Sequence, residues 1–210
     1  MTPFRFGAAA AALLALLLGS SSFAGDIISD WGKAVPPPPP ALKEVTIDAS
    51  TTALLILNMM QANCNRRERC KAAFPNVKRL HDEARAHNMM VWYSFVGGGP
   101  ETVYDPSIKP RDGEWYSING GDKFIGSTLE PLLTEHGIKT VIICGTSFQG
   151  ATAGTASGAT QRGFKAIVPV DCSSSEDEYH EQYAAFHVSV GGPALLTSNT
   201  TLTRSTMMKF

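Results

Sequence analysis

The sequence lacks the features that identify several large classes of binding protein. Its 18 lysine and arginine residues nearly balance 19 acidic residues, and it has no long basic run, so no nucleic-acid partner is expected. The glycine-rich stretch after Cys144 contains neither G-x-G-x-x-G nor a Walker pattern, which leaves phosphate binding a weak alternative. With 43% hydrophobic residues, the chain of 210 residues can form one globular domain with a sizeable core.

The first 24 residues lack an apolar stretch long enough to cross a bilayer. Ala8 to Leu18 is an unbroken apolar segment of 11 residues, preceded by Arg5 and followed by the small-x-small site Ser22-Phe23-Ala24. This pattern is typical of a cleavable secretory signal peptide. We therefore expect cleavage after Ala24, export to the periplasm or the medium, and no membrane span in the mature chain.

A proline-rich arm, residues 25–49, is expected between the signal peptide and a single domain over residues 50–210. Pro36 to Pro40 are consecutive prolines, which form a stiff extended segment of about 15 Å at roughly 3.1 Å per residue. We favour a spacer or a strap over the domain surface. A ligand for a proline-binding module is the alternative, although such modules are mostly cytosolic.

Cysteine is scarce, and in an exported chain the four residues present favour disulfides. Cys64 and Cys70 enclose a short basic stretch and are expected to bridge a loop after the first strand. Cys144 and Cys172 each follow or end a predicted strand. They are either bridged to each other or, in the alternative, Cys144 is a small buried hydrophobic residue.

Hydrophobic periodicity predicts an alternation of strands and helices. Strands are expected over residues 51–58, 89–96, 140–144, 164–170 and 201–204, the last at a sheet edge, with helices over 71–87, 127–136, 149–162 and 176–188. A long loop over 101–121 is typical of a functional segment. This order predicts a Rossmann-like, three-layer α/β/α sandwich with a mostly parallel central sheet.

The stretch 139–171 forms the centre of this fold as a βαβ unit. Ligands of open α/β sheets bind at the carboxyl ends of the strands, so function is expected around residues 145–151. Gly150, Gly154 and Gly158 are spaced by four and share one helix face. Each costs about 1 kcal/mol relative to alanine in a helix, so we expect close packing there by the sheet or by a partner subunit.

Three segments resemble the isochorismatase-like cysteine hydrolases, the family of isochorismatase, nicotinamidase and N-carbamoylsarcosine amidase. They are TALLILNMMQ (52–61), DKFIGSTLEPLL (122–133) and, most specifically, the strand, turn, helix and strand of 141–171. The likeness covers about residues 50–205. It implies hydrolysis by a cysteine nucleophile, with an aspartate base and a supporting lysine. The thiolate would lie at a helix N-terminus beside backbone N–H groups that form an oxyanion hole.

The three catalytic positions implied by the resemblance carry other residues here. The aspartate falls on Asn58 and the cysteine on Ala151, while the lysine falls near Ile118, with Lys123 the nearest cation. Alanine is not a nucleophile and asparagine is not a base, so nearly all of the family's rate should be lost. The nicotinamidase metal site needs histidine in the loop 101–121, which has none. We therefore expect no metal and no cofactor.

The resemblance also implies a pocket with a cis peptide bond near Thr146–Ser147. The pocket residues it predicts are Asn58, Gln61, Phe124, Thr146, Ser147, Phe148, Gln149, Gly150 and Ala151. Candidates for a substitute catalytic group are Cys172, Ser147 and Lys123. His180 and His187 share one helix face but are interpreted as surface or core residues, because isolated histidines carry no site signal. Glu176, Asp177 and Glu178 are interpreted as an acidic first helical turn.

Three functional hypotheses follow. The favoured one is an exported isochorismatase-like protein without cysteine-dependent hydrolysis, whose retained pocket binds a small molecule or a partner protein. The alternative is a divergent hydrolase of C–N amide, ester or enol-ether bonds that uses a relocated nucleophile, Cys172 or Ser147. The third is a structural partner in a homo-oligomer, with the glycine stripe or the proline arm at the interface.

Overall fold

The computed structural model describes residues 25–210, so the predicted signal peptide lies outside the described residues. The chain divides into two compact units, Met1–Pro38 and Pro39–Phe210. In the described part of the first unit, the carboxylate of Asp26 accepts hydrogen bonds from two following backbone N–H groups, and a short 3-10 helix spans Trp31–Lys33. Across residues 25–210, no helix combines the length and apolar character that crossing a membrane requires.

The second unit begins earlier than the expected boundary at residue 50. Leu42 packs against the main hydrophobic core, and β1 (Val45–Thr46) pairs in parallel with β9 (Met208–Lys209) near the end of the chain. The second compact unit therefore includes the segment 39–49, the last part of the predicted arm. Pairing with β9 provides hydrogen-bond partners for the backbone of this short strand.

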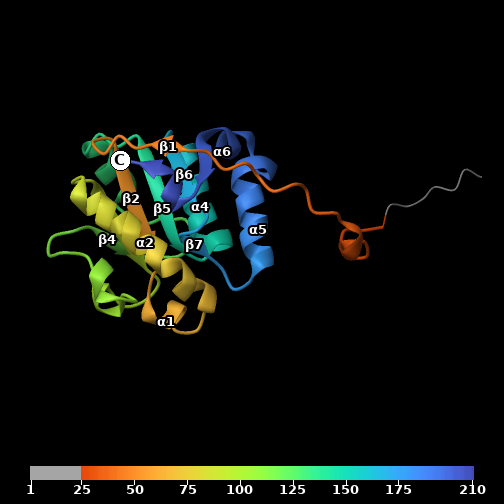
Figure 1. Cartoon of the computed structure of the whole chain (residues 1–210), viewed down its shortest axis with the longest axis horizontal. Helices are drawn as coiled ribbons and strands as arrows, with labels where there is room; N and C mark the ends of the chain where they lie inside the picture. Colours follow the sequence, from red (N-terminus) through yellow and green to blue (C-terminus); the bar gives the residue numbers. More distant parts are fainter. Residues whose placement is uncertain (1–24) are drawn as a thin grey trace, which may run out of the picture. The chain divides into compact units, whose positions relative to one another are not determined.

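A parallel sheet forms the centre of the domain (Figure 1), as the alternation of strands and helices predicts. Its strand order is β4-β3-β2-β5-β6-β8, with the short β7 paired to β5, and every described pair in it is parallel. The strands are β2 (Thr52–Leu57), β3 (Met90–Phe95), β4 (Tyr116–Ile118), β5 (Thr140–Thr146), β6 (Lys165–Pro169), β7 (Ser173–Ser174) and β8 (Thr200–Thr203). β2 is buried at every residue because it lies in the middle of the sheet with helices on both faces.

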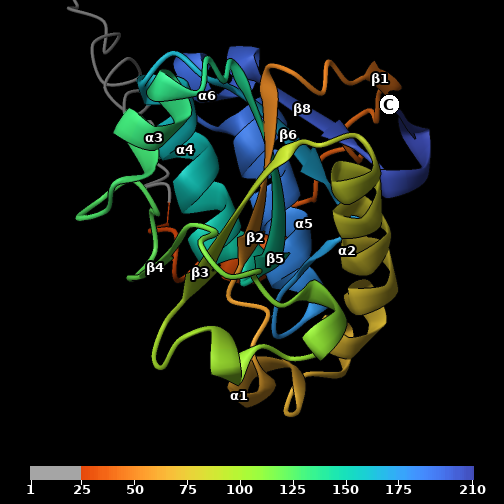
Figure 2. The same ribbon diagram turned by 90° about the vertical axis from the view of Figure 1, so that its left-hand side faces the viewer.

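Helices cover both faces of the sheet, which confirms the predicted sandwich. Figure 2 shows α3 and α4 on one side of β2 and β5, and α2 on the other. Alternate residues of β2 divide between two cores: Leu55 and Leu57 face α3, α4, α5 and α6, whereas Leu54 and Ile56 face α2. The helices are α1 (Gln61–Cys64), α2 (Glu68–Ala86), α3 (Leu129–Glu135), α4 (Ala153–Gln161), α5 (Glu178–Phe186) and α6 (Ala194–Asn199).

Several elements differ from the expected ones. The helix expected over 149–162 begins as a π-helical turn, Phe148–Thr152, before α4. Cys64 and Cys70 are bridged, but they lie in α1 and α2 rather than at the ends of a loop. The very short α1, α6, β4 and β7 were not predicted, because elements of two to six residues contain too few positions for a period to be read.

The glycine face of α4 packs against a loop, which corrects the expectation of the sheet or a partner subunit. A Cβ at Gly158 would lie 2.4 Å from Oδ1 of Asp122, and one at Gly154 would lie 3.3 Å from the backbone nitrogen of Asp122. Gly150 belongs to the π-helical turn, where a Cβ would lie 2.6 Å from Oγ of Ser147. The stripe thus brings the segment around Asp122 close to the carboxyl edge of the sheet.

Candidate functional site

Asn58 follows β2 directly and is held rigidly at the carboxyl edge of the sheet. It has a φ of 54°, a left-handed conformation that asparagine tolerates better than most residues. Its backbone N–H donates to the carbonyl of Ser94 at 2.9 Å, and its own carbonyl accepts from Nδ2 of Asn63 at 2.9 Å. The end of β3 and α1 therefore fix the direction of a side chain that is only 4% exposed.

Lys123 is the cation that meets Asn58. Its Nζ donates to Oδ1 of Asn58 at 3.1 Å and to the backbone carbonyl of Asn119 at 2.8 Å. The hydroxyl of Ser94 donates to the same amide oxygen at 3.1 Å. The alignment of the family lysine with Ile118 does not hold in space, because Ile118 lies on β4 with 56% of its surface exposed.

Contacts with α4 and with the start of α3 fix the loop that carries Lys123. The backbone N–H of Lys123 donates to Oγ1 of Thr155 on α4 at 3.2 Å, and its carbonyl accepts from Oγ of Ser127 at 2.6 Å. Asp122 does not bond to the amine. Its carboxylate accepts from the backbone N–H of Phe124 at 2.9 Å and lies 3.9 Å from Nη1 of Arg162.

The environment of Lys123 disfavours its charge. Burial lowers the pKa of its amine from 10.5 to about 8, and the nearby charge of Asp122 offsets this only in part. The side chain is fully buried, and both of its hydrogen-bond acceptors are neutral. A carboxylate at position 58 would favour the charged form, but the amide of Asn58 does so only weakly.

The turn after β5 has the cis peptide bond that the resemblance implies, and Ala151 lies at the position expected for the nucleophile. The Thr146–Ser147 peptide bond is cis. Gly145 has a φ of 135°, and a Cβ there would lie 2.0 Å from the carbonyl oxygen of Leu57, so no other residue fits. Ala151, 5% exposed, lies in the π-helical turn and presents a methyl group in place of a thiol.

The structure removes one substitute nucleophile and leaves another without a base. Cys172 is bridged to Cys144, which settles the open alternative for these residues, and all four cysteines of the chain are paired. The prediction that Cys172 could act as a substitute nucleophile is therefore wrong. Within residues 25–210, the hydroxyl of Ser147 has no hydrogen-bond partner, so no side chain is placed to take its proton. No cluster of three or more potential metal-ligating side chains occurs among these residues.

A set of ion pairs, which we call the clasp, joins the disulfide segment to the start of α5. Nε of Arg67 lies 2.9 Å from Glu176, and Arg69 binds Glu181 through two hydrogen bonds of 2.8 and 2.5 Å. Glu178 lies 3.5 Å from Arg69. The clasp was missed in the sequence, although a basic stretch between cysteines and an acidic helix start were both visible.

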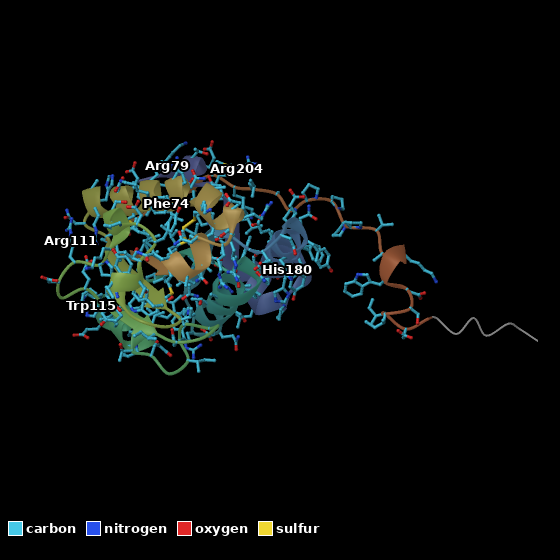
Figure 3. All side chains as sticks on the ribbon, turned by 90° about the horizontal axis from the view of Figure 1, so that it is seen from below. Phe74, Arg79, Arg111, Trp115, His180 and Arg204 are labelled. Carbon is cyan, nitrogen blue, oxygen red and sulfur yellow. A yellow bond between two sulfur atoms is a disulfide. The ribbon has the colours of Figure 1, made fainter. Side chains whose placement is uncertain are left out.

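The clasp reaches the turn after β5 through polar residues. Nη1 of Arg67 lies 3.5 Å from Oγ1 of Thr146, and Oγ of Ser175 bonds to Gln149 at 2.6 Å. His180, labelled in Figure 3, bonds to Asp177 at 2.8 Å on exposed α5. His187 stacks on Tyr183. These histidines therefore have surface contacts and lie outside the group around Asn58.

The predicted pocket residues gather at one end of the sheet, but their side chains close the site. Phe124, Phe148 and Ala151 join the same hydrophobic core and are at most 5% exposed. Gln61, at the start of α1, is exposed instead. Two surface hollows lie elsewhere: one of about 270 Å³ along the loop 100–116, and one of about 380 Å³ at the amino end of the sheet.

Comparisons with known proteins agree with this architecture. The family model described as the isochorismatase domain matches residues 52–199. An uncharacterized isochorismatase family protein, YwoC of Bacillus subtilis, is 28% identical over 69% of this chain and 89% of its own length. N-carbamoylsarcosine amidase of an Arthrobacter species is 30% identical over 45% of this chain and 47% of its own. The crystal structure of a cysteine hydrolase from Pseudomonas syringae pv. phaseolicola covers 80% of this chain and 94% of its own, with 14% identity and a TM-score of 0.67.

Proposed function

Because the chain belongs to the isochorismatase family, we propose that it binds a small molecule at the carboxyl edge of its sheet without the family's cysteine-dependent hydrolysis. One observation carries the proposal: Asn58 and Lys123 are bonded to each other, beside a turn in which Ala151 replaces the nucleophile. The arrangement supports the proposal because the side chains of Asn58 and Ala151 offer neither a base nor a nucleophile.

The chemistry of each side chain supports this reading. The amide oxygen of Asn58 accepts hydrogen bonds, as a carboxylate would, but it does not take up a proton near neutral pH. The methyl group of Ala151 cannot attack a carbonyl carbon, and no cysteine in the chain is free to replace it. Lys123 is present, but Ala151 gives it no thiolate whose charge it could stabilise.

A divergent hydrolase is the alternative, because a relative is named as an amidase. It would have to use Ser147 as the nucleophile. Among residues 25–210, the ionisable side chain bonded to Asn58 is that of Lys123. Export remains part of the proposal: residues 1–24 have the pattern of a signal peptide, and two disulfides suit an oxidising compartment. A homo-oligomer loses the support of the glycine stripe, since the segment around Asp122 occupies it.

The test is turnover by the disulfide-bonded chain from Gly25 to Phe210. Ammonia and acid release would be measured with nicotinamide, N-carbamoyl compounds, ureido acids and isochorismate. We expect none from the unmodified chain, and turnover from an Ala151→Cys/Asn58→Asp variant. Hydrolysis by the unmodified chain that disappears in Ser147→Ala would overturn the proposal and establish the alternative. An Asn58→Asp variant, with no nucleophile added, is the matched control.

A further inference from the structure

We propose that the site receives a small monoanion, a carboxylate or an inorganic anion, whose charge is balanced by the fully buried Lys123 that has only neutral hydrogen-bond partners. The inference rests on the proposed function, because it names the ligand class of the same site. The two parts can fail separately: turnover would refute the proposed function, whereas absence of anion binding would refute only this inference.

Among the residues that the structure describes, 25–210, the hydrogen bonds of Lys123 leave one of its N–H donors without a partner. An ammonium group has three N–H donors, and two of them reach Oδ1 of Asn58 at 3.1 Å and the carbonyl of Asn119 at 2.8 Å. Both acceptors carry only partial charge. Buried charged groups are as a rule paired with an opposite charge, so the amine has both a free donor and an unbalanced charge to offer a ligand.

Asp122, the acidic residue whose charge acts on this amine, is engaged by other groups. Asp122, the preceding residue, bonds to the backbone N–H of Phe124 and lies beside Arg162. Glu176 pairs with Arg67 in the clasp, and Arg67 also contacts Thr146. The end of β3 contributes the neutral hydroxyl of Ser94, and the end of β2 contributes the amide. An anionic ligand would supply the negative charge that these neighbours lack while the amine is protonated.

Glycines lie on both sides of Lys123 in the loop that carries it. Gly120 and Gly121 precede the lysine, and a Cβ at either would meet no atom within 4 Å. Gly126 follows it with a φ of 65°. Glycines on both sides give the segment more backbone freedom than other residues would. Because Phe124 and Phe148 fill the adjacent core, the anion admitted must be small.

The experiment measures anion binding by the full disulfide-bonded chain, with acetate and chloride as separate probes. NMR of the lysine side chains would follow the titration of Lys123 with and without each anion. We expect saturable binding and an apparent pKa of Lys123 that rises when the anion is bound. An anion binds the protonated amine, so affinity should be full well below pH 8 and fall about tenfold per pH unit above it.

Two variants test the charge balance directly. Asn58→Asp supplies an internal carboxylate and should abolish binding of either anion, while Lys123→Met should do the same by removing the charge. Lys139→Met, which removes an exposed lysine at the start of β5, is the matched control and should bind as the unmodified chain does. If Lys123→Met does not fold, Asn58→Asp still decides the question.

The two probes also separate the sources of the anion. Acetate binding that chloride does not displace indicates a carboxylate ligand, and binding of both in competition indicates a general anion site. Either result supports the inference. It is overturned if neither probe binds at concentrations up to about 0.1 M, or if Asn58→Asp binds acetate as tightly as the unmodified chain.

Discussion

The buried amine of Lys123 should make the protein more stable as the pH rises from 8 toward 10.5. Its pKa is about 8 in the folded chain against 10.5 when unperturbed. Between these values the unfolded chain binds a proton that the folded chain does not, so the free energy of unfolding increases with pH. At 1.36 kcal/mol per pKa unit, the gain is about 2 kcal/mol by pH 9.5 and about 3 kcal/mol by pH 10.5.

Urea denaturation at pH 8.0 and 9.5 would measure this gain. The upper limit avoids Tyr93, whose pKa is raised above its usual value by burial and which would lower stability as the pH passes 10. The unmodified chain should gain about 2 kcal/mol more over this interval than Lys123→Met, whatever the absolute stability of that variant. Lys139→Met, at an exposed position, should keep the full gain.

Asn58→Asp should remove the same gain by a different route. A carboxylate at the 3.1 Å contact stabilises the ammonium by several kcal/mol at an effective dielectric constant of about 20, and desolvation of the carboxylate offsets part of it. The pKa of Lys123 should then rise back toward its usual value. A gain in Asn58→Asp equal to that of the unmodified chain would refute the reasoning.

Three further predictions concern other parts of the structure. His81, whose pKa burial lowers from 6.5 to about 4, should make stability rise between pH 4 and 6.5, and a urea series with His81→Gln should lose that rise. Gly158→Ala places a Cβ 2.4 Å from the carboxylate of Asp122 and should cost about 1–3 kcal/mol in urea denaturation while shifting the titration of Lys123 by NMR. Arg69→Ala breaks two hydrogen bonds to Glu181 and should lower the free energy of unfolding by about 1 kcal/mol, and by less in high salt. An unchanged free energy of unfolding would mean that the ion pairs of Arg69 do not stabilise the protein.

The main strands and the larger helices could be predicted because their apolar residues form long, recognisable patterns. β2 is apolar at nearly every position and is buried on both faces. The site could be predicted only in part. Asn58 and Ala151 lie in segments of fixed length next to strands, so a resemblance locates them well. The cation lies in a loop, where sequence spacing does not determine which side chain turns inward. The resemblance therefore located the lysine only near Ile118, with Lys123 as the nearest cation, and the structure shows that Lys123 bonds to Asn58.

The glycine stripe shows a second limit of sequence reasoning. A spacing of four indicates that another segment packs closely against one face of α4. It does not identify which segment that is. The occupant, the segment around Asp122, comes from a loop more than thirty residues earlier in the chain. Similarly, Cys144 and Cys172 could be called neighbours only on condition that their segments are adjacent, which the pairing of β7 with β5 provides.

The two substitutions that would restore hydrolysis should act together and not separately. Ala151→Cys alone places a thiol in the π-helical turn without a proton acceptor, since Asn58 stays neutral. Asn58→Asp alone supplies the acceptor and binds Lys123, but nothing attacks the substrate. Groups that act as one catalytic unit are strongly non-additive, so each single variant should be as inactive as the unmodified chain, and only the double variant should release ammonia. Substantial activity in Ala151→Cys alone would mean that Lys123, with its lowered pKa, accepts the thiol proton without an aspartate.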